Sequence, residues 1–248
     1  MKSTASIIAL VSLLSTAATA QTSSPAASQA ACLPVTTVEN FNLTQYASAP
    51  WYVQQQAVNT YTPLERNRCV TAQYNLKDNT NWWDQSWWGY TVDVFNYAET
   101  ADGHSTGGNL CADYDDNMPS QLMVAPCFLP KLFAGPYWIV AYQEGADDGY
   151  VLVSGGQPNN IVDGESSCGA SGTDGCCKTG DGINNSGLWI LTRQANPSDG
   201  LVQEVRQIAQ QKGFATSVLF DVTHDENCDV PNIDDNTRFL RQQQQQRK

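Results

Sequence analysis

The residues of this chain whose type and spacing could do chemistry are its cysteines. Cysteine thiols either oxidise to disulfides or bind metal ions such as zinc. A zinc site would need paired CxxC motifs or several histidines, but the sequence has no paired CxxC and only His104 and His224. We therefore expect four disulfides, no metal and no cofactor. The eight cysteines are Cys32, Cys69, Cys111, Cys127, Cys168, Cys176, Cys177 and Cys228.

Spacing alone constrains two sets of cysteines. Cys111 and Cys127 lie symmetrically about Pro119, so a hairpin turning at residues 117–120 would place them opposite each other, within reach of a disulfide. Cys176 and Cys177 are adjacent, and the distance of about 3.8 Å between consecutive Cα atoms is shorter than disulfides usually tolerate. Each of these two therefore needs a different partner.

No other residues form a recognisable catalytic pattern. The sequence shows no Ser-His-Asp spacing, no histidine-rich metal set and no glycine loop of the kind that cradles phosphate. We expect no catalytic residues and no enzymatic activity.

The N-terminal residues indicate a secreted, extracellular protein, and the charge restricts its partners. Residues 1–20 have a positive start, a short apolar run and a small-x-small cleavage site, which is typical of a signal peptide. Residues 21–31 predict a flexible segment, and the glutamine-rich residues 231–248 predict a disordered tail. The net charge of −12 disfavours a nucleic-acid partner, because phosphate contacts need clustered Lys and Arg.

Between these ends the pattern is one of many short strands followed by a single helix. Alternating or apolar runs predict eight strands, and a helix start at residues 196–199 precedes an apolar stripe that ends before Gly213. This order predicts an all-β fold, an eight-stranded antiparallel up-and-down β-barrel with one C-terminal α-helix packed outside. The predicted strands cover 51–56, 69–76, 90–97, 107–114, 121–128, 136–142, 150–155 and 188–193.

One face of each predicted strand would line the inside of the barrel. A barrel of eight strands is just wide enough to hold one small ligand or to be filled by side chains. We predict that a hydrophobic ligand contacts one residue of a loop, Phe133, and the strand residues Val53, Gln55, Val70, Ala72, Tyr74, Val92, Val94, Tyr137, Ile139 and Leu152.

The chain resembles the lipocalins, and within them the branch of apolipoprotein D and the bacterial lipocalins. The resemblance implies a cup-shaped barrel, spanning residues 32–230 here, that binds small hydrophobic molecules. The matching segments, in order along the chain, are Glu39-Asn40-Phe41, Trp51-Tyr52, Asn67-Arg68-Cys69, Ala101-Asp102-Gly103, Pro136-Tyr137-Trp138-Ile139, Leu188 to Arg193, Gly213-Phe214 and Asn227-Cys228.

The resemblance also implies roles for individual residues. Trp51 matches the family's tryptophan at the floor of the cup, and Arg193 matches the arginine that packs across it. Cys69 and Cys228 match a disulfide pair of the family. Cys32 matches a cysteine whose partner follows the seventh strand, and in this chain the candidates are Cys168, Cys176 and Cys177.

Two loops differ in their predicted roles. Residues 157–187 form a long polar insertion that the family layout puts at the open end, either as a stapled lid or as a passive insertion. The largely apolar loop at residues 128–133 would also lie at the mouth. There it could contact a ligand, bind weakly to a membrane or simply pack against the barrel.

A tryptophan cluster lies between the second and third predicted strands. The family layout puts this turn at the closed end, so capping of the barrel base or a protein contact is favoured over a ligand cage. The cluster comprises Trp82, Trp83, Trp87 and Trp88.

The function that follows is that of a monomeric carrier or scavenger of a small hydrophobic molecule, from the fatty acid, sterol, retinoid, carotenoid or tetrapyrrole classes. One alternative is a lipid isomerase or de-epoxidase, which would need a reactive thiol or carboxylate inside the cup. Another is a protein-interaction module whose barrel is filled by side chains.

Overall fold

The computed structural model describes residues 32–77, 88–162, 175–228 and 230. Outside this part of the chain lie the predicted signal peptide (1–20), the segment 21–31, the tail (231–248), Cys168 and three of the clustered tryptophans, Trp82, Trp83 and Trp87. Those predictions, and the domain boundaries with them, remain predictions.

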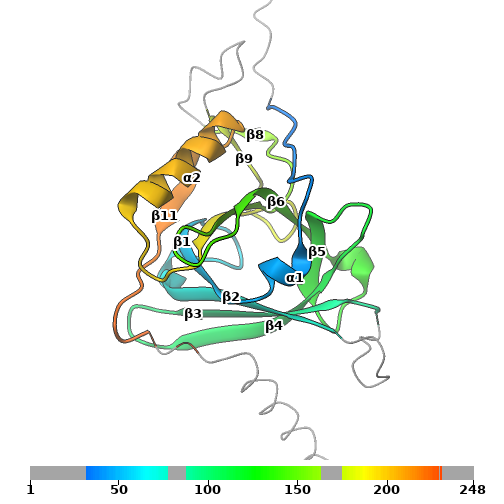
Figure 1. Ribbon diagram of the computed structural model, residues 1–248, viewed down its shortest axis with the longest axis horizontal. Helices are drawn as coiled ribbons and strands as arrows, with labels where there is room; N and C mark the ends of the chain where they lie inside the picture. Colours follow the sequence, from blue (N-terminus) through cyan, green and yellow to red (C-terminus); the bar gives the residue numbers. More distant parts are fainter. Residues whose placement is uncertain (1–31, 78–87, 163–174, 229, 231–248) are drawn as a thin grey trace, which may run out of the picture.

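Eight strands form a closed antiparallel barrel, as the sequence pattern predicts (Figure 1). Each strand pairs with the next along the chain, and the eighth pairs back onto the first through Tyr52 to Gln56, which closes the ring. The barrel strands are β1 (Trp51–Ala57), β2 (Arg68–Leu76), β3 (Val92–Glu99), β4 (Ser105–Asp113), β5 (Gln121–Pro126), β6 (Gly135–Gln143), β7 (Tyr150–Ser154) and β10 (Leu188–Thr192).

Three shorter strands lie outside this ring. β8 (Asn160–Ile161) and β9 (Cys177–Lys178) pair within the inserted loop. β11 (Leu219–Asp221) pairs with the end of β1, where β1 and β2 have separated. The segment after the helix therefore extends the sheet at the edge of β1, and the chain after β11 continues beside Asn67 and Arg68.

The helix α2 (Asp199–Gln211) covers one outer face of the barrel (Figure 1). The Ser198 hydroxyl accepts a hydrogen bond from the Leu201 amide, which caps the first turn, and Gly213 follows the helix with a φ of 89°. The apolar stripe of α2 packs against the outward side chains of β7 and β10, so both faces of β7 and the outward face of β10 are buried. The stripe consists of Leu201, Val205 and Ala209.

A short helix that the sequence analysis did not anticipate, α1 (Leu43–Tyr46), plugs one end of the barrel (Figure 1). Asn42 caps it by accepting a hydrogen bond from the Gln45 amide. Leu43 and Tyr46 are buried in the same cluster as Trp51, so α1 closes the end at which β1 begins. Three single turns of 3-10 helix, Leu64–Arg66, Lys131–Phe133 and Thr216–Val218, lie between strands or beside β11.

The disulfides agree with the predicted pairs. Cys111 bonds Cys127 with a Cα separation of 4.8 Å, and Cys69 bonds Cys228 at 5.4 Å. Cys32 bonds Cys177, one of its three candidate partners, at 5.8 Å. Cys176 is also disulfide-bonded. Asp93 lies near the sulfurs of Cys111 and Cys127, but thiols joined in a disulfide are not available as metal ligands.

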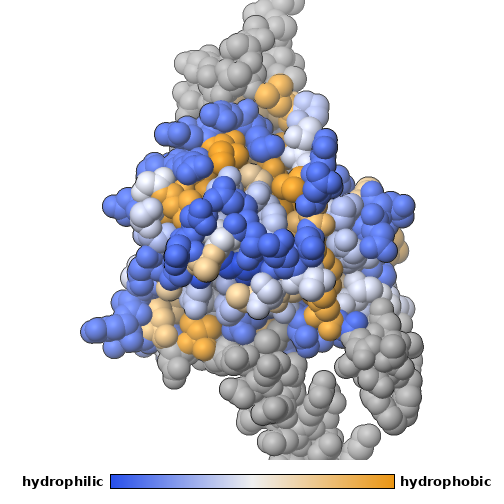
Figure 2. Space-filling view, viewed as in Figure 1, coloured by the Kyte–Doolittle hydropathy of each residue, from blue (hydrophilic) through white to orange (hydrophobic). Residues whose placement is uncertain are grey.

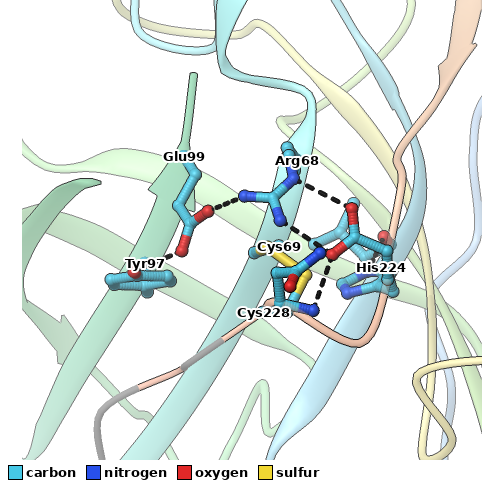
Figure 3. The surroundings of a disulfide bond; sticks show 9 residues. Arg68, Cys69, Tyr97, Glu99, His224 and Cys228 are labelled. Carbon is cyan, nitrogen blue, oxygen red and sulfur yellow. Dashed lines mark hydrogen bonds and ion pairs between the residues drawn. A yellow bond between two sulfur atoms is a disulfide. The ribbon is translucent and has the colours of Figure 1, made fainter. Parts of the chain in front are cut away.

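Ion pairs surround the Cys69–Cys228 disulfide (Figure 3). Arg68 pairs with Glu99 on β3 and donates to the Asp225 carboxylate at 2.7 and 3.2 Å. Cys69 itself has a φ of 53°, at an irregularity in the pairing of β2 with β3. Disulfide and ion pairs together hold the chain after β11 against the barrel.

Within the described part of the chain, no helix is long and apolar enough to cross a bilayer. The face in Figure 2 is largely hydrophilic, with apolar residues in separate groups.

Candidate ligand-binding site

The barrel encloses a cavity of about 540 Å³ between the packed plug and the opposite, open end. Its walls come from β1 to β6 and β10, and its rim comes from the loops at residues 61–66, 129–133 and 183–186. The end nearer α1 is filled by a buried cluster that includes Trp51, Val92, Leu122, Ile139 and Val151. The barrel is thus solid at one end and hollow at the other.

Seven of the predicted ligand contacts line this cavity, namely Val53, Val70, Ala72, Tyr74, Val94, Phe133 and Tyr137. Two others, Val92 and Ile139, lie in the buried cluster below it. Gln55 and Leu152 face the outside of the barrel instead, on the side that α2 covers.

A β-bulge explains the position of Gln55. The pairing of β1 with β10 shifts between Val53 and Gln55, and one extra residue moves every later side chain to the opposite face. Gln55 therefore bonds Asp221 at 2.6 Å and Arg206 at 2.7 Å outside, whereas Gln56 lines the cavity.

Leu152 lies outside the cavity, contrary to the prediction, for a different reason. Every residue of β7 is buried, since the barrel interior covers one face and α2 the other. A strand buried on both faces has no polar alternation that reveals which residues point inward. Val151 and Val153 point into the barrel, and Leu152 packs against α2.

The floor is organised by Arg193 and Trp51. The guanidinium carbon of Arg193 lies 3.6 Å from the centre of the Trp51 ring. Arg193 also donates to the carbonyls of Gln45, Tyr46 and Ala49 and to the Glu144 carboxylate. The arginine thereby ties α1, the start of β1 and the loop after β6 together beneath the cavity.

A ring of three tyrosine hydroxyls lies between this floor and the cavity. The hydroxyl oxygens of Tyr74 and Tyr137 are 2.7 Å apart, those of Tyr46 and Tyr137 are 2.9 Å apart, and those of Tyr46 and Tyr74 are 3.2 Å apart. Tyr74 and Tyr137 line the cavity, while Tyr46 reaches them from α1 and is fully buried. Burial raises the pKa of all three phenols, so each stays protonated at neutral pH.

Aromatic rings continue from this ring of hydroxyls to the rim. Trp189 stacks with Tyr137 and with Tyr61 at centroid distances of 6.3 Å in both cases. Tyr61 lies at the rim, in the loop between β1 and β2, so the rings of Tyr61, Trp189 and Tyr137 form a wall along the depth of the cavity. Sequence reasoning placed Trp189 in a strand but did not identify it, Tyr61 or Gln56 as lining the interior.

Gln56 adds a buried polar atom to this apolar wall. Its side-chain nitrogen donates to the Asn67 side chain at 2.6 Å. Its side-chain oxygen is buried and has no hydrogen-bond partner within the described part of the chain. A buried carbonyl without a partner is costly, and a donor on a bound molecule would satisfy it.

The end of the inserted loop forms part of the rim. The Tyr61 hydroxyl donates to the Ser186 carbonyl at 2.7 Å, and the Thr60 amide donates to the Asp181 carbonyl at 3.1 Å. Ile183 lines the mouth and is 76% exposed. Earlier in the loop, the Cys177 amide donates to the carbonyl of Gly213, just after α2. Cys177 also forms the disulfide with Cys32, so the loop is anchored both to the end of α2 and to the start of the described chain.

The loop at residues 127–134 contributes to the rim and also folds back along the barrel wall. Phe133 lines the cavity, whereas Phe128 and Leu132 are largely exposed. The Trp88 indole donates to the Phe128 carbonyl at 3.0 Å, and the Lys131 ammonium lies 2.5 Å from Asp113. Trp88, which precedes β3, therefore contacts the loop between β5 and β6.

Comparison with known proteins identifies the fold. No family model and no curated protein matches the sequence. Among solved structures, the cockroach allergen Per a 4 superposes with a TM-score of 0.50 and 13% identity, over 79% of this chain and 97% of that one. Insecticyanin from the tobacco hornworm Manduca sexta gives a TM-score of 0.50 and 11% identity, over 79% and 88%.

The chain has the lipocalin fold. At these identities the similarity concerns the architecture alone, which is the closed eight-stranded barrel with one helix packed outside. The ligand chemistry of this lipocalin-fold protein depends on the side chains that line its own cavity.

Proposed function

We propose that this protein is an extracellular carrier or scavenger of one small hydrophobic molecule, which it binds inside the barrel. The observation that carries the proposal is the cavity of about 540 Å³, which is lined mainly by apolar and aromatic side chains and opens at the end opposite α1. This volume is in the usual range for small-molecule sites. The candidate ligands are fatty acids, sterols, retinoids, carotenoids and tetrapyrroles.

Burial of the ligand supplies the affinity in this proposal. Removing about 300 Å² of apolar ligand surface from water at about 25 cal/mol per Å² corresponds to about 7 kcal/mol before association costs. Micromolar or somewhat tighter binding is then expected.

The composition of the lining favours a carrier over an enzyme. No carboxylate, histidine or thiol is found among the described residues that line the cavity, and a lipid isomerase needs such a group next to its substrate. The hollow interior favours ligand binding over a protein-interaction module with a filled barrel.

Several further features belong to the same proposal. We place the protein in the branch of apolipoprotein D and the bacterial lipocalins, as a secreted monomer without a nucleic-acid partner. We also propose that the inserted loop acts as a lid, because Ile183 and residues 184–186 lie at the rim of the cavity. Exposed Phe128, Leu132 and Trp88 offer a site for weak membrane or protein contact.

Native mass spectrometry with a panel of the five ligand classes tests the central proposal. Ala98→Phe would fill part of the cavity, whereas Asn75→Phe adds the same ring at an exposed position. One ligand should bind per chain to the wild type and to Asn75→Phe, with weaker binding to Ala98→Phe. If no class binds, or if Ala98→Phe binds as well as the wild type, the proposal fails.

A further inference from the structure

The three tyrosine hydroxyls at the inner end of the cavity form a closed set of hydrogen bonds. Each hydroxyl has one proton, and there are three contacts among three oxygens, so each can donate once and accept once around the ring. Each oxygen keeps one further lone pair. The oxygens of Tyr74 and Tyr137 belong to side chains that line the cavity, so this spare capacity is available to a bound molecule.

The ring can also open to give a donor. Its longest contact, 3.2 Å, joins Tyr46 to Tyr74, and the other two contacts are 2.9 and 2.7 Å. If Tyr46 donates to Tyr137 and Tyr137 donates to Tyr74, both short bonds are kept and the Tyr74 proton is free to point into the cavity. Successive hydrogen bonds of this kind polarise and strengthen one another. The ring can therefore accept from a hydroxyl or donate to a carbonyl.

The surroundings of the ring favour an uncharged partner. All three phenols are neutral because burial raises the pKa of each. The nearest arginine at the floor, Arg193, pairs with Glu144 and lies against the Trp51 ring. Arg66, the one cation among the described lining residues, is exposed in the loop between β1 and β2. A carboxylate at the inner end would lose its water without gaining a partner of opposite charge.

We propose that the ligand carries a neutral oxygen, a hydroxyl or a carbonyl, and that it enters with this oxygen first, to hydrogen-bond with Tyr74 and Tyr137. The inference rests on the proposed carrier function. Trp189 and the ring of Tyr137 then contact the apolar body of the ligand.

Four probes with twelve carbons each test this inference, namely dodecane, dodecanol, methyl decyl ketone and dodecanoate, used as competitors of a neutral fluorescent dye. The wild type should bind the alcohol and the ketone about 3- to 10-fold more tightly than the alkane, as one hydrogen bond predicts. Tyr74→Phe and Tyr137→Phe should each lower that preference and leave alkane binding unchanged. Tyr52→Phe, on an outward position of β1 beside His224, is the matched control.

Each other outcome contradicts the inference in a recognisable way. Tightest binding of dodecanoate, lost in Arg66→Gln, would place a charged head group at the mouth. A preference for the alcohol alone, lost in Gln56→Leu, would assign the oxygen to the orphan carbonyl of Gln56. Equal binding of all four probes would remove the polar anchor but keep the carrier function, whereas binding of none would overturn both. Thermal unfolding of every variant checks that the fold is retained.

Discussion

Arg193 lies over the ring of Trp51, with the guanidinium carbon 3.6 Å from the centre of the ring and a side chain that is only 4% exposed. The arginine satisfies carbonyls at the end of α1 and just before β1, and its charge is balanced by Glu144. Neither the ring nor the carbonyls can be reached equally well by a lysine, because an ammonium lacks the planar fork of donors.

Arg193→Lys should therefore destabilise the protein although it keeps the charge. Losing the cation–π contact and at least one hydrogen bond to a charged donor corresponds to about 2–4 kcal/mol of unfolding free energy. Urea unfolding followed by fluorescence measures it. Arg66→Lys, at an exposed position, should change the unfolding free energy by less than about 0.5 kcal/mol. Equal effects of the two substitutions would show that the floor contact is not stabilising.

The barrel could be predicted from the sequence because its strands are short and numerous and are followed by one strongly amphipathic helix. The sequence was also sufficient for three disulfide assignments, although that of Cys32 was narrowed only to three partners. The strands, the helix and the Cys111–Cys127 pair follow from local pattern and spacing, whereas the Cys69–Cys228 pair and the candidate partners of Cys32 were implied by the resemblance to the lipocalins.

The interior could be predicted only where alternation continues without interruption. Val70, Ala72 and Tyr74 alternate along β2 and all line the cavity. A bulge after Val53 reverses the alternation of β1, and bulges leave no reliable mark in a single sequence. The tyrosine ring was also hidden, since Tyr46 belongs to a four-residue helix whose position depends on packing against Trp51.

Removing the Tyr61 hydroxyl should speed the release of a ligand. That hydroxyl donates to the Ser186 carbonyl and joins the inserted loop to the loop between β1 and β2. Tyr61→Phe keeps the ring that stacks on Trp189, so the cavity wall is unchanged. We expect a dissociation rate about 3- to 10-fold higher, measured by stopped-flow, with a nearly unchanged melting temperature. Unchanged release would show that the rim does not act as a lid.

Stability should fall below neutral pH because of His224. The imidazole is buried, its Nε2 lies 2.9 Å from the Val53 carbonyl oxygen, and its Nδ1 has no partner in the described part of the chain. Burial lowers the pKa of His224 below its usual value, and this outweighs the opposing effects of that carbonyl and of Asp225. The unfolded chain therefore binds a proton at a higher pH than the folded protein does.

The resulting contribution to stability is fully present above the unfolded pKa of about 6.5 and is lost as pH falls toward the folded value. Urea unfolding between about pH 7.5 and 5.5 should show this decline in the wild type. His224→Gln should flatten the curve, while the exposed His104→Gln should not. The same slope in His224→Gln would assign the decline to other groups.

The two disulfides Cys69–Cys228 and Cys111–Cys127 should differ in their contribution to stability. They join residues that are 159 and 16 positions apart, and a cross-link that closes a longer loop restricts the unfolded chain more. Chain-entropy reasoning gives about 5 kcal/mol for the long loop and about 3 kcal/mol for the short one, the first being an upper limit because Cys32–Cys177 already shortens the path. The ion pairs of Arg68 add to the effect, since the chain after β11 carries Asp225.

We therefore expect the double variant Cys69→Ala/Cys228→Ala to lose more unfolding free energy than Cys111→Ala/Cys127→Ala, measured by urea unfolding at one pH. Hydrogen exchange locates the difference. In the first variant two amides should lose protection, that of Thr223, which donates to the Asn67 carbonyl, and that of residue 69, which donates to the Thr223 carbonyl. These two hydrogen bonds hold the segment after β11 against the start of β2. In the second variant the loop at residues 127–134 should lose protection instead. The opposite order of stabilities would show that native contacts around the short hairpin outweigh the restriction of the unfolded chain.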